Sequence, residues 1–208
     1  MSTSNSARTD GPSYHHGNLR QALVEKGLEL LEAGQADISL RELTRQVGVS
    51  ANAAYRHFAS KEDLLAAMAA EGFRRLATVQ AMAMQERGTA AEGFLEAGRN
   101  YVAFARRHPA LFRLMFGRFA ASNRSEEMLQ SAELAYGGLR YGVAAALGLP
   151  VEDAKVLPAA MHAWSLVHGL SQLIIDGQMD AHTTDVDALV DAVLLQAAYL
   201  AGKSDPTG

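Results

Sequence analysis

SLRELTRQVGVSANAAYRHFASK, residues 39–61, reads as two short helices joined by a tight turn, with the start of a third helix behind them. Its first half carries apolar residues at the i, i+3 and i+7 spacing of one helix face: Leu40, Leu43 and Val47. Gly48 takes a positive φ at little cost, and Ser50 is a good N-cap for the next helix. The stretch therefore predicts two helices that meet at a sharp turn.

The second helix, predicted for residues 51–58, begins with small side chains. A helix that enters the major groove of DNA needs a slim leading edge with a few polar side chains on it. Ser60 is the predicted cap of a third helix, and Lys61 beside that helix start favours an anion such as a backbone phosphate. The pattern predicts a DNA-binding surface made of Arg41, Ser50, Asn52, Ala53, Tyr55, Arg56, His57 and Lys61.

Charge is distributed unevenly along the chain. Residues 38–61 hold four Arg or Lys and one acid, for a net charge of +3, whereas the whole chain carries −4. A protein without overall affinity for polyanions thus concentrates positive charge in one segment. This supports the assignment of that segment to nucleic acid.

Over residues 17–76 the sequence resembles the TetR family of bacterial transcriptional regulators. The resemblance rests on Leu40, Gly48-Val49-Ser50, Ala54-Tyr55-Arg56-His57-Phe58 and Ser60-Lys61-Glu62-Asp63-Leu64-Leu65. Ala54 departs from the family pattern, which usually has Leu there, and Ala51 and Ala53 stand where polar base-reading residues are common. The resemblance implies that sequence preference depends on Asn52, Tyr55, Arg56 and Arg41.

Composition sets the broad class. The chain has 208 residues, 49% of them hydrophobic, and no Cys, which is consistent with a reducing cytoplasm. It has no uninterrupted apolar run of about 18 residues and no apolar leader, so we expect a soluble cytoplasmic protein with no membrane segment. The adjacent His15 and His16 lack a third ligand at a sensible spacing, so we predict neither a metal nor a cofactor.

The rest of the chain shows helical spacing and no convincing strand, so the predicted class is all-α. An N-terminal three-helix helix-turn-helix DNA-binding domain precedes a larger C-terminal helical ligand-binding and dimerisation domain. The predicted segments are a disordered arm at 1–13, the DNA-binding domain at 14–76 with its helix-turn-helix at 39–58, the C-terminal domain at 77–202 and a tail at 203–208. A long helix over 60–85 belongs to both domains and can act as a lever between them. Residues 117–123 are predicted to be a loop, and Pro158 either kinks a helix or opens it.

The C-terminal half has two features that predict an effector pocket and a homodimer. Trp164-Ser165-Leu166-Val167-His168-Gly169 resembles the Trp-His-Gly segment of one C-terminal class in the TetR family. An apolar effector pocket is predicted from Tyr101, Phe104, Phe112, Met115, Phe116, Phe119, His162, Trp164 and His168, with ordinary hydrophobic core as the alternative. Helical segments near 158–175 and 185–201 are apolar on more than one face, which predicts a homodimer; a thicker monomeric core is the alternative.

The leading hypothesis is a ligand-responsive homodimeric regulator that binds a palindromic double-stranded DNA operator and is released by a small-molecule effector. Repression is the family's usual mode. An enzyme is not expected, because the chain lacks Cys, a Gly-x-Ser-x-Gly elbow, a phosphate-binding Gly-rich loop and HExxH. A helical scaffold that has lost operator reading is the alternative. The Ala-rich start of the second helix favours that alternative, whereas Arg41, Tyr55, Arg56 and Lys61 oppose it.

Overall fold

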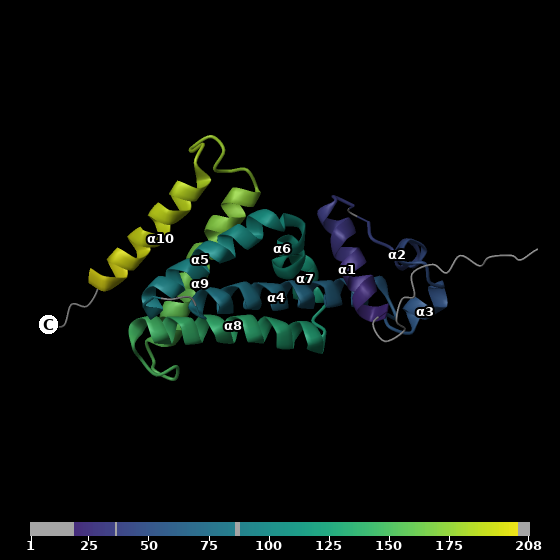
Figure 1. Ribbon diagram of the computed structural model, residues 1–208, viewed down its shortest axis with the longest axis horizontal. Helices are drawn as coiled ribbons and strands as arrows, with labels where there is room; N and C mark the ends of the chain where they lie inside the picture. Colours follow the sequence, from purple (N-terminus) through teal and green to yellow (C-terminus); the bar gives the residue numbers. More distant parts are fainter. Residues whose placement is uncertain (1–18, 36, 86–87, 204–208) are drawn as a thin grey trace, which may run out of the picture.

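The computed structural model describes residues 19–35, 37–85 and 88–203, and within these ranges it contains helices and no strand (Figure 1). The predicted all-α class is therefore confirmed. The helices are α1 (Leu19–Glu32), α2 (Leu40–Val47), α3 (Ala51–Tyr55), α4 (Lys61–Gln85), α5 (Ala90–Arg107), α6 (Pro109–Phe116), α7 (Arg118–Ser122), α8 (Glu126–Leu147), α9 (Val156–Ile175) and α10 (Val186–Lys203). The predicted arm at 1–13 and the pair His15-His16 lie outside the described residues.

The molecule has a small helical unit at one end and a larger body at the other. In Figure 1, α1, α2 and α3 lie together at the right, and α4 runs from them along the length of the body. Helix α4 packs most extensively on α8 and next on α5, while α10 packs on α5. One long helix therefore belongs to both parts, as the sequence predicted.

The small unit is held by a compact apolar core. Its fully or almost fully buried side chains come from α1, α2, α4 and the connecting segments: Leu23, Val24, Leu28, Ile38, Leu43, Phe58, Leu64 and Met68. Helices α1 and α4 approach closely at Gly27, where an added Cβ would lie 2.8 Å from the Met68 sulfur. This close packing fixes α1 on the first part of α4.

Polar contacts spread along α1 join the small unit to the rest of the chain. Arg20 forms an ion pair with Glu127 at the start of α8. Glu25 pairs with Arg75 of α4. At the C-terminal end of α1, the Glu32 carboxylate accepts a 3.3 Å hydrogen bond from the Leu111 N–H in the first turn of α6. These contacts tie α1 to α4, α6 and α8.

Several sequence predictions need correction. Helix α3 ends at Tyr55 rather than near residue 58, because the chain turns there and directs Phe58 into the core. The predicted loop at 117–123 contains α7, and Asn123 holds its end through a 3.1 Å hydrogen bond from its side-chain amide to the Phe119 carbonyl. Pro158 is the third residue of α9, where its missing N–H costs nothing, so it opens the helix. Within the described residues, no helix is both long enough and apolar enough to cross a membrane.

Candidate nucleic-acid interface

The turn between α2 and α3 has the geometry that its sequence predicts. Gly48 has φ 78° and ψ 29°, the left-handed conformation that ends α2, and its N–H donates to the Thr44 carbonyl. The Val49 N–H donates to the same carbonyl at 2.9 Å. The Ser50 hydroxyl then accepts the Ala53 N–H at 3.3 Å and caps α3. These contacts fix the angle at which α3 leaves the unit.

Helix α3 has one buried side and one side open to solvent. Ala54 is fully buried and Phe58, just after the helix, is 1% exposed. Ala54, where the family usually has Leu, is thus a core residue and cannot reach a base. Asn52, Arg56 and His57 are exposed, and 48% of Tyr55 is accessible. The open side therefore carries the polar residues predicted to contact DNA.

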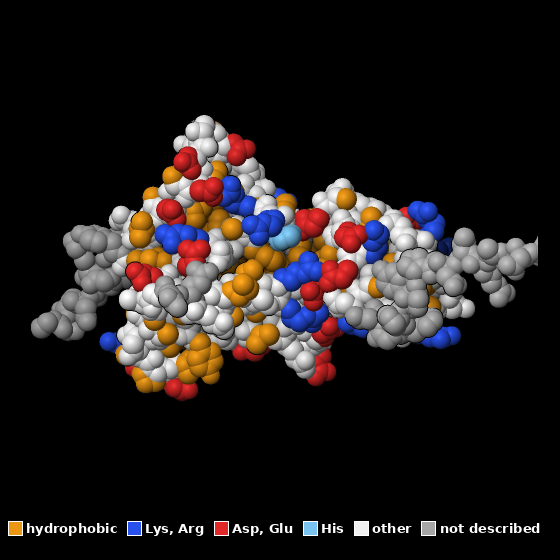
Figure 2. Space-filling view, viewed as in Figure 1, with side chains coloured by type: hydrophobic (Ala, Val, Ile, Leu, Met, Phe, Trp, Pro, Cys, Tyr) orange, Lys and Arg blue, Asp and Glu red, His pale blue; other side chains and the backbone are white. Residues whose placement is uncertain are grey.

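Helix α2, the turn after α3 and the start of α4 carry four cations, two of which have acidic partners. Arg45 pairs with Glu42 on the same helix, with Nε 3.0 Å from Oε2, and Lys61 pairs with Asp37. Arg41 and Arg56 are exposed and form no ion pair within the described part of the chain. Figure 2 shows Lys and Arg side chains at the outer end of the small unit. Arg41 and Arg56 are thus the cations most available to a phosphate or a base.

The paired acids are held in their charged forms. Hydrogen bonds from Arg45 and Gln46 lower the pKa of Glu42 to about 2. The Lys61 ammonium lowers the pKa of Asp37 through a hydrogen bond and its charge. Both pairs lie at the surface, where ion pairs stabilise a protein by only about 0–1 kcal/mol. A DNA phosphate can therefore replace Asp37 beside Lys61 at small cost. Sequence reasoning missed Asp37, because it lies in a loop 24 residues from its partner.

The start of α4 is capped from within the chain. The Ser60 hydroxyl accepts the Asp63 N–H at 3.1 Å, and the Asp63 carboxylate accepts the Ser60 N–H at 3.1 Å. Because Glu62 and Asp63 already place negative charge in this first turn, the helix end alone is a poor anion site. Attraction of a phosphate to this place depends on the Lys61 side chain.

Comparison with known families covers both parts of the molecule. Residues 23–68 match the model described as bacterial regulatory proteins, tetR family, and residues 94–197 match the model described as tetracyclin repressor-like, C-terminal domain. The chain belongs to the TetR family. Members of this family are transcriptional regulators that bind DNA through the helix-turn-helix, here α2 and α3. The Trp-His-Gly class suggested by residues 164–169 stays a prediction.

Solved structures share the fold over most of the TetR-family chain. A protein of unknown function from Rhodococcus sp. RHA1 is 30% identical, with 91% of this chain and 96% of that chain covered and a TM-score of 0.74. A tetR-family transcriptional regulator from Streptomyces coelicolor is 19% identical, with coverages of 88% and 80% and a TM-score of 0.69. PfmR, a TetR family transcriptional regulator from Thermus thermophilus, is 18% identical, with coverages of 83% and 94% and a TM-score of 0.58. The last two inform the fold alone. No match was found among curated proteins.

The residues predicted to line an effector pocket divide among several places in the body. An aromatic cluster brings together five of them: Tyr101, Phe112, Phe116, Trp164 and His168. Phe112 and His168 stack with ring centroids 5.2 Å apart. Met115 is buried against Gly72 of α4, whereas His162 is exposed and Phe119 lies half-buried on α7. Phe104 packs beside His108 instead, with ring centroids 5.2 Å apart.

The aromatic cluster contains a chain of hydrogen bonds. The Trp164 Nε1–H donates to the Tyr101 hydroxyl oxygen at 3.3 Å, and that hydroxyl lies 2.9 Å from His168 Nδ1. The Tyr101 O–H can then donate to Nδ1, which places the proton of a neutral His168 on Nε2. Burial lowers the pKa of His168 and raises the pKa of Tyr101, so both groups stay neutral near pH 7. The Trp164 Nε1–H, the Tyr101 hydroxyl and the His168 Nδ1 thus each have a hydrogen-bond partner within the cluster.

Proposed function

We propose that this TetR-family protein binds a palindromic DNA operator as a homodimer, represses transcription from it, and is released by a small-molecule effector. The observation that carries the proposal is the division of α3 into a buried side at Ala54 and an open polar side at Asn52, Tyr55 and Arg56. A helix so exposed, capped and flanked by cations fits the major groove. As a regulator of bacterial DNA, it would act in the cytoplasm.

We assign separate roles to the exposed residues. Asn52 suits bidentate pairing with adenine, and Arg56 suits bidentate pairing with guanine, so these two would read bases. Arg41 and Lys61 lie outside α3, on α2 and at the start of α4, and would hold phosphates. Ser50, Ala53, Tyr55 and His57 complete the proposed contact surface. Ala53 would contribute its small size, which lets α3 approach the bases closely.

The proposed dimer uses the C-terminal helices. Leu157, Met161 and Leu173 of α9 are exposed, as is Leu195 of α10. An added Cβ at Gly169 would meet no atom within 4 Å, so the α9 surface is open there. Exposed apolar side chains on neighbouring turns favour burial against a second copy. A two-fold axis through this surface would present two α3 helices to half-sites about 34 Å apart, one turn of DNA.

The contacts between α1 and the body support the proposed release by an effector. The Glu127 and Arg75 side chains and the Leu111 backbone N–H of α6 each contact a side chain of α1. An effector that favours a different position of α6 or α8 would therefore change the position of α1 and, with it, α3. DNA affinity would fall by the effector's differential affinity for the two arrangements.

The proposal is tested by the salt dependence of binding between the full chain and duplex DNA. We expect log K to fall steeply with log salt concentration, and we expect Lys61→Ala to reduce that slope by about one unit while weakening binding to all sequences alike. The matched control is Lys155→Ala, which removes the same charge from the exposed segment before α9, at the opposite end of the molecule (Figure 1). A protein that binds no duplex at low salt would instead support the helical scaffold.

A further inference from the structure

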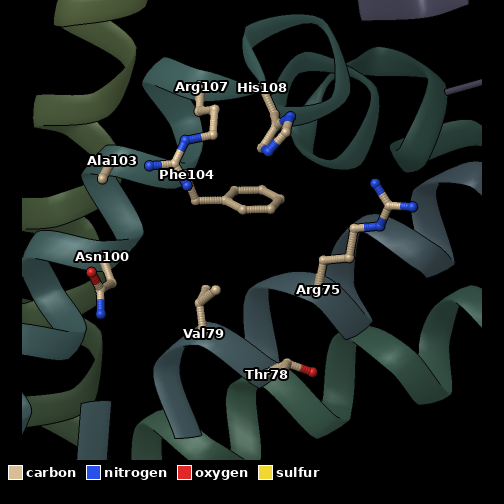
Figure 3. Close-up of a pocket in the computed structure, with 8 residues that line it drawn as sticks. All are labelled: Arg75, Thr78, Val79, Asn100, Ala103, Phe104, Arg107 and His108. Atoms are coloured by element: carbon tan, nitrogen blue, oxygen red, sulfur yellow. The ribbon is translucent and has the colours of Figure 1, made fainter. Parts of the chain in front are cut away.

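An open cleft lies on the body between α4 and α5, next to the start of α6. It has a volume of about 350 Å³, at the small end of the range for ligand sites. Its lining residues are Arg75, Thr78, Val79, Asn100, Ala103, Phe104, Arg107 and His108. In Figure 3 the Phe104 ring lies between Arg107 and His108 on one side and Arg75, Val79 and Thr78 on the other. The cleft thus combines an apolar floor with a polar rim.

The charges of the lining residues are not balanced. Two guanidinium groups and an imidazole line the cleft, and no carboxylate does. Arg75 is already paired with Glu71 and Glu25, and His108 Nδ1 lies 3.6 Å from Glu32 Oε1. Arg107 is exposed and makes no side-chain hydrogen bond or ion pair within the part of the chain that the structure describes. One positive charge therefore remains for a ligand.

We propose that this cleft binds a small amphiphilic monoanion, a carboxylate with a short apolar chain. The carboxylate would lie on the Arg107 guanidinium, whose planar fork can donate two parallel hydrogen bonds to it. The apolar chain would cover Phe104 and Val79, which form the floor. Asn100 makes no side-chain hydrogen bond among the described residues, and its amide is free to bind a further polar group of the ligand. Figure 2 shows this region near the middle of the visible face, where blue and pale-blue side chains border orange ones.

The position of the cleft gives the ligand an effect on α1. His108 immediately precedes α6, and the Glu32 oxygen near it also accepts the Leu111 N–H of α6. The ligand's carboxylate on Arg107, the residue before His108, would add negative charge on this side of the cleft, repel Glu32 and weaken the attachment of α6 to α1. The ligand would thus favour the arrangement in which the small unit is released from the body. This effector role rests on the proposed function, whereas binding in the cleft does not.

The test measures octanoate binding to the full chain in the absence of DNA, by titration calorimetry, with 1-octanol as the uncharged comparison. Octanoate is expected to bind at one site per chain, at least about tenfold more tightly than 1-octanol, because one charge-assisted contact is lost in the alcohol. Arg107→Gln is expected to weaken octanoate binding about tenfold. Arg106→Gln is the matched control: it removes the same charge from the preceding residue, which pairs with Asp187 and does not line the cleft.

Three outcomes overturn the proposal: no binding of octanoate, equal binding of octanoate and 1-octanol, or equal weakening by the two variants. Duplex binding without octanoate is measured in parallel. If octanoate binds as expected and no duplex does, the proposed regulatory function fails and the ligand site stands. If a duplex binds and octanoate does not, the site fails and the regulatory function stands.

Discussion

Replacement of Gly72 by Ala tests whether α4 and α6 are packed as tightly as the structure indicates. An added Cβ at Gly72 would lie 2.5 Å from the Met115 sulfur and 2.9 Å from Leu111 Cδ1. Ordinary contacts between such atoms are about 3.5–4.0 Å, so the Met115 and Leu111 side chains, or α6 with them, would have to move by about 1 Å. Leu111 and Met115 are each 1% exposed. Overpacking of this kind lowers the free energy of unfolding by about 1–3 kcal/mol.

The comparison variant is Gly137→Ala on α8, where an added Cβ would meet no atom within 4 Å. Each substitution raises the helix propensity by the same amount, about 1 kcal/mol. The difference in the free energy of unfolding between the two variants therefore isolates the steric cost at Gly72. Urea unfolding at one fixed protein concentration is expected to show Gly72→Ala less stable than Gly137→Ala by about 1–3 kcal/mol. If the two variants proved equally stable, the close contact between α4 and α6 would be refuted.

Three further predictions concern the cap, the base contacts and the aromatic cluster. Ser50→Ala removes the cap of α3 and should lower the free energy of unfolding by about 0.5–2 kcal/mol in urea titrations. Asn52→Ala and Arg56→Ala should each reduce discrimination between the preferred base and the others by about 1–3 kcal/mol, measured by competition between duplexes, with non-specific affinity less affected. Burial lowers the pKa of His168 in the folded protein, so the unfolded chain binds the proton more readily. The free energy of unfolding should therefore fall as the pH drops below about 6.5. In the His168→Gln variant this fall should be smaller than in the parent protein.

The local chemistry of the sequence predicted the elements that depend on neighbouring residues. The Ser50 cap, the left-handed Gly48 and the capping pair of Ser60 and Asp63 all act within four residues of their partners. The long helix α4 was predicted because its apolar positions repeat without a break up to the polar segment near residue 85. Trp164 and His168, four residues apart, do project together, with ring centroids 6.1 Å apart.

The same reasoning could not predict contacts between residues far apart in the sequence. Helix α10 docks on α5 through Arg99 and Asp191, 92 residues apart, with Nε 2.6 Å from Oδ1, and a single sequence offers no sign of that pairing. The pocket prediction grouped aromatic residues by composition, but the direction of each side chain depends on its helix's neighbours. Phe104 therefore lies in the α4–α5 cleft and His162 at the surface, away from the aromatic cluster. Arg107 and His108 were not predicted to bind a ligand, because charged residues are common at helix ends. Only the structure shows that a cleft lies beside them.

Selection of bound duplexes from a random DNA pool by the full chain tests directly whether α3 reads a symmetric operator. If α3 reads the major groove and a two-fold dimer sets the spacing, the enriched sequences should form a palindrome whose half-sites are centred about one helical turn apart. Asn52→Ala should lose preference at matching positions in both half-sites. No enrichment over the starting pool, or an enriched site without two-fold symmetry, would contradict the account.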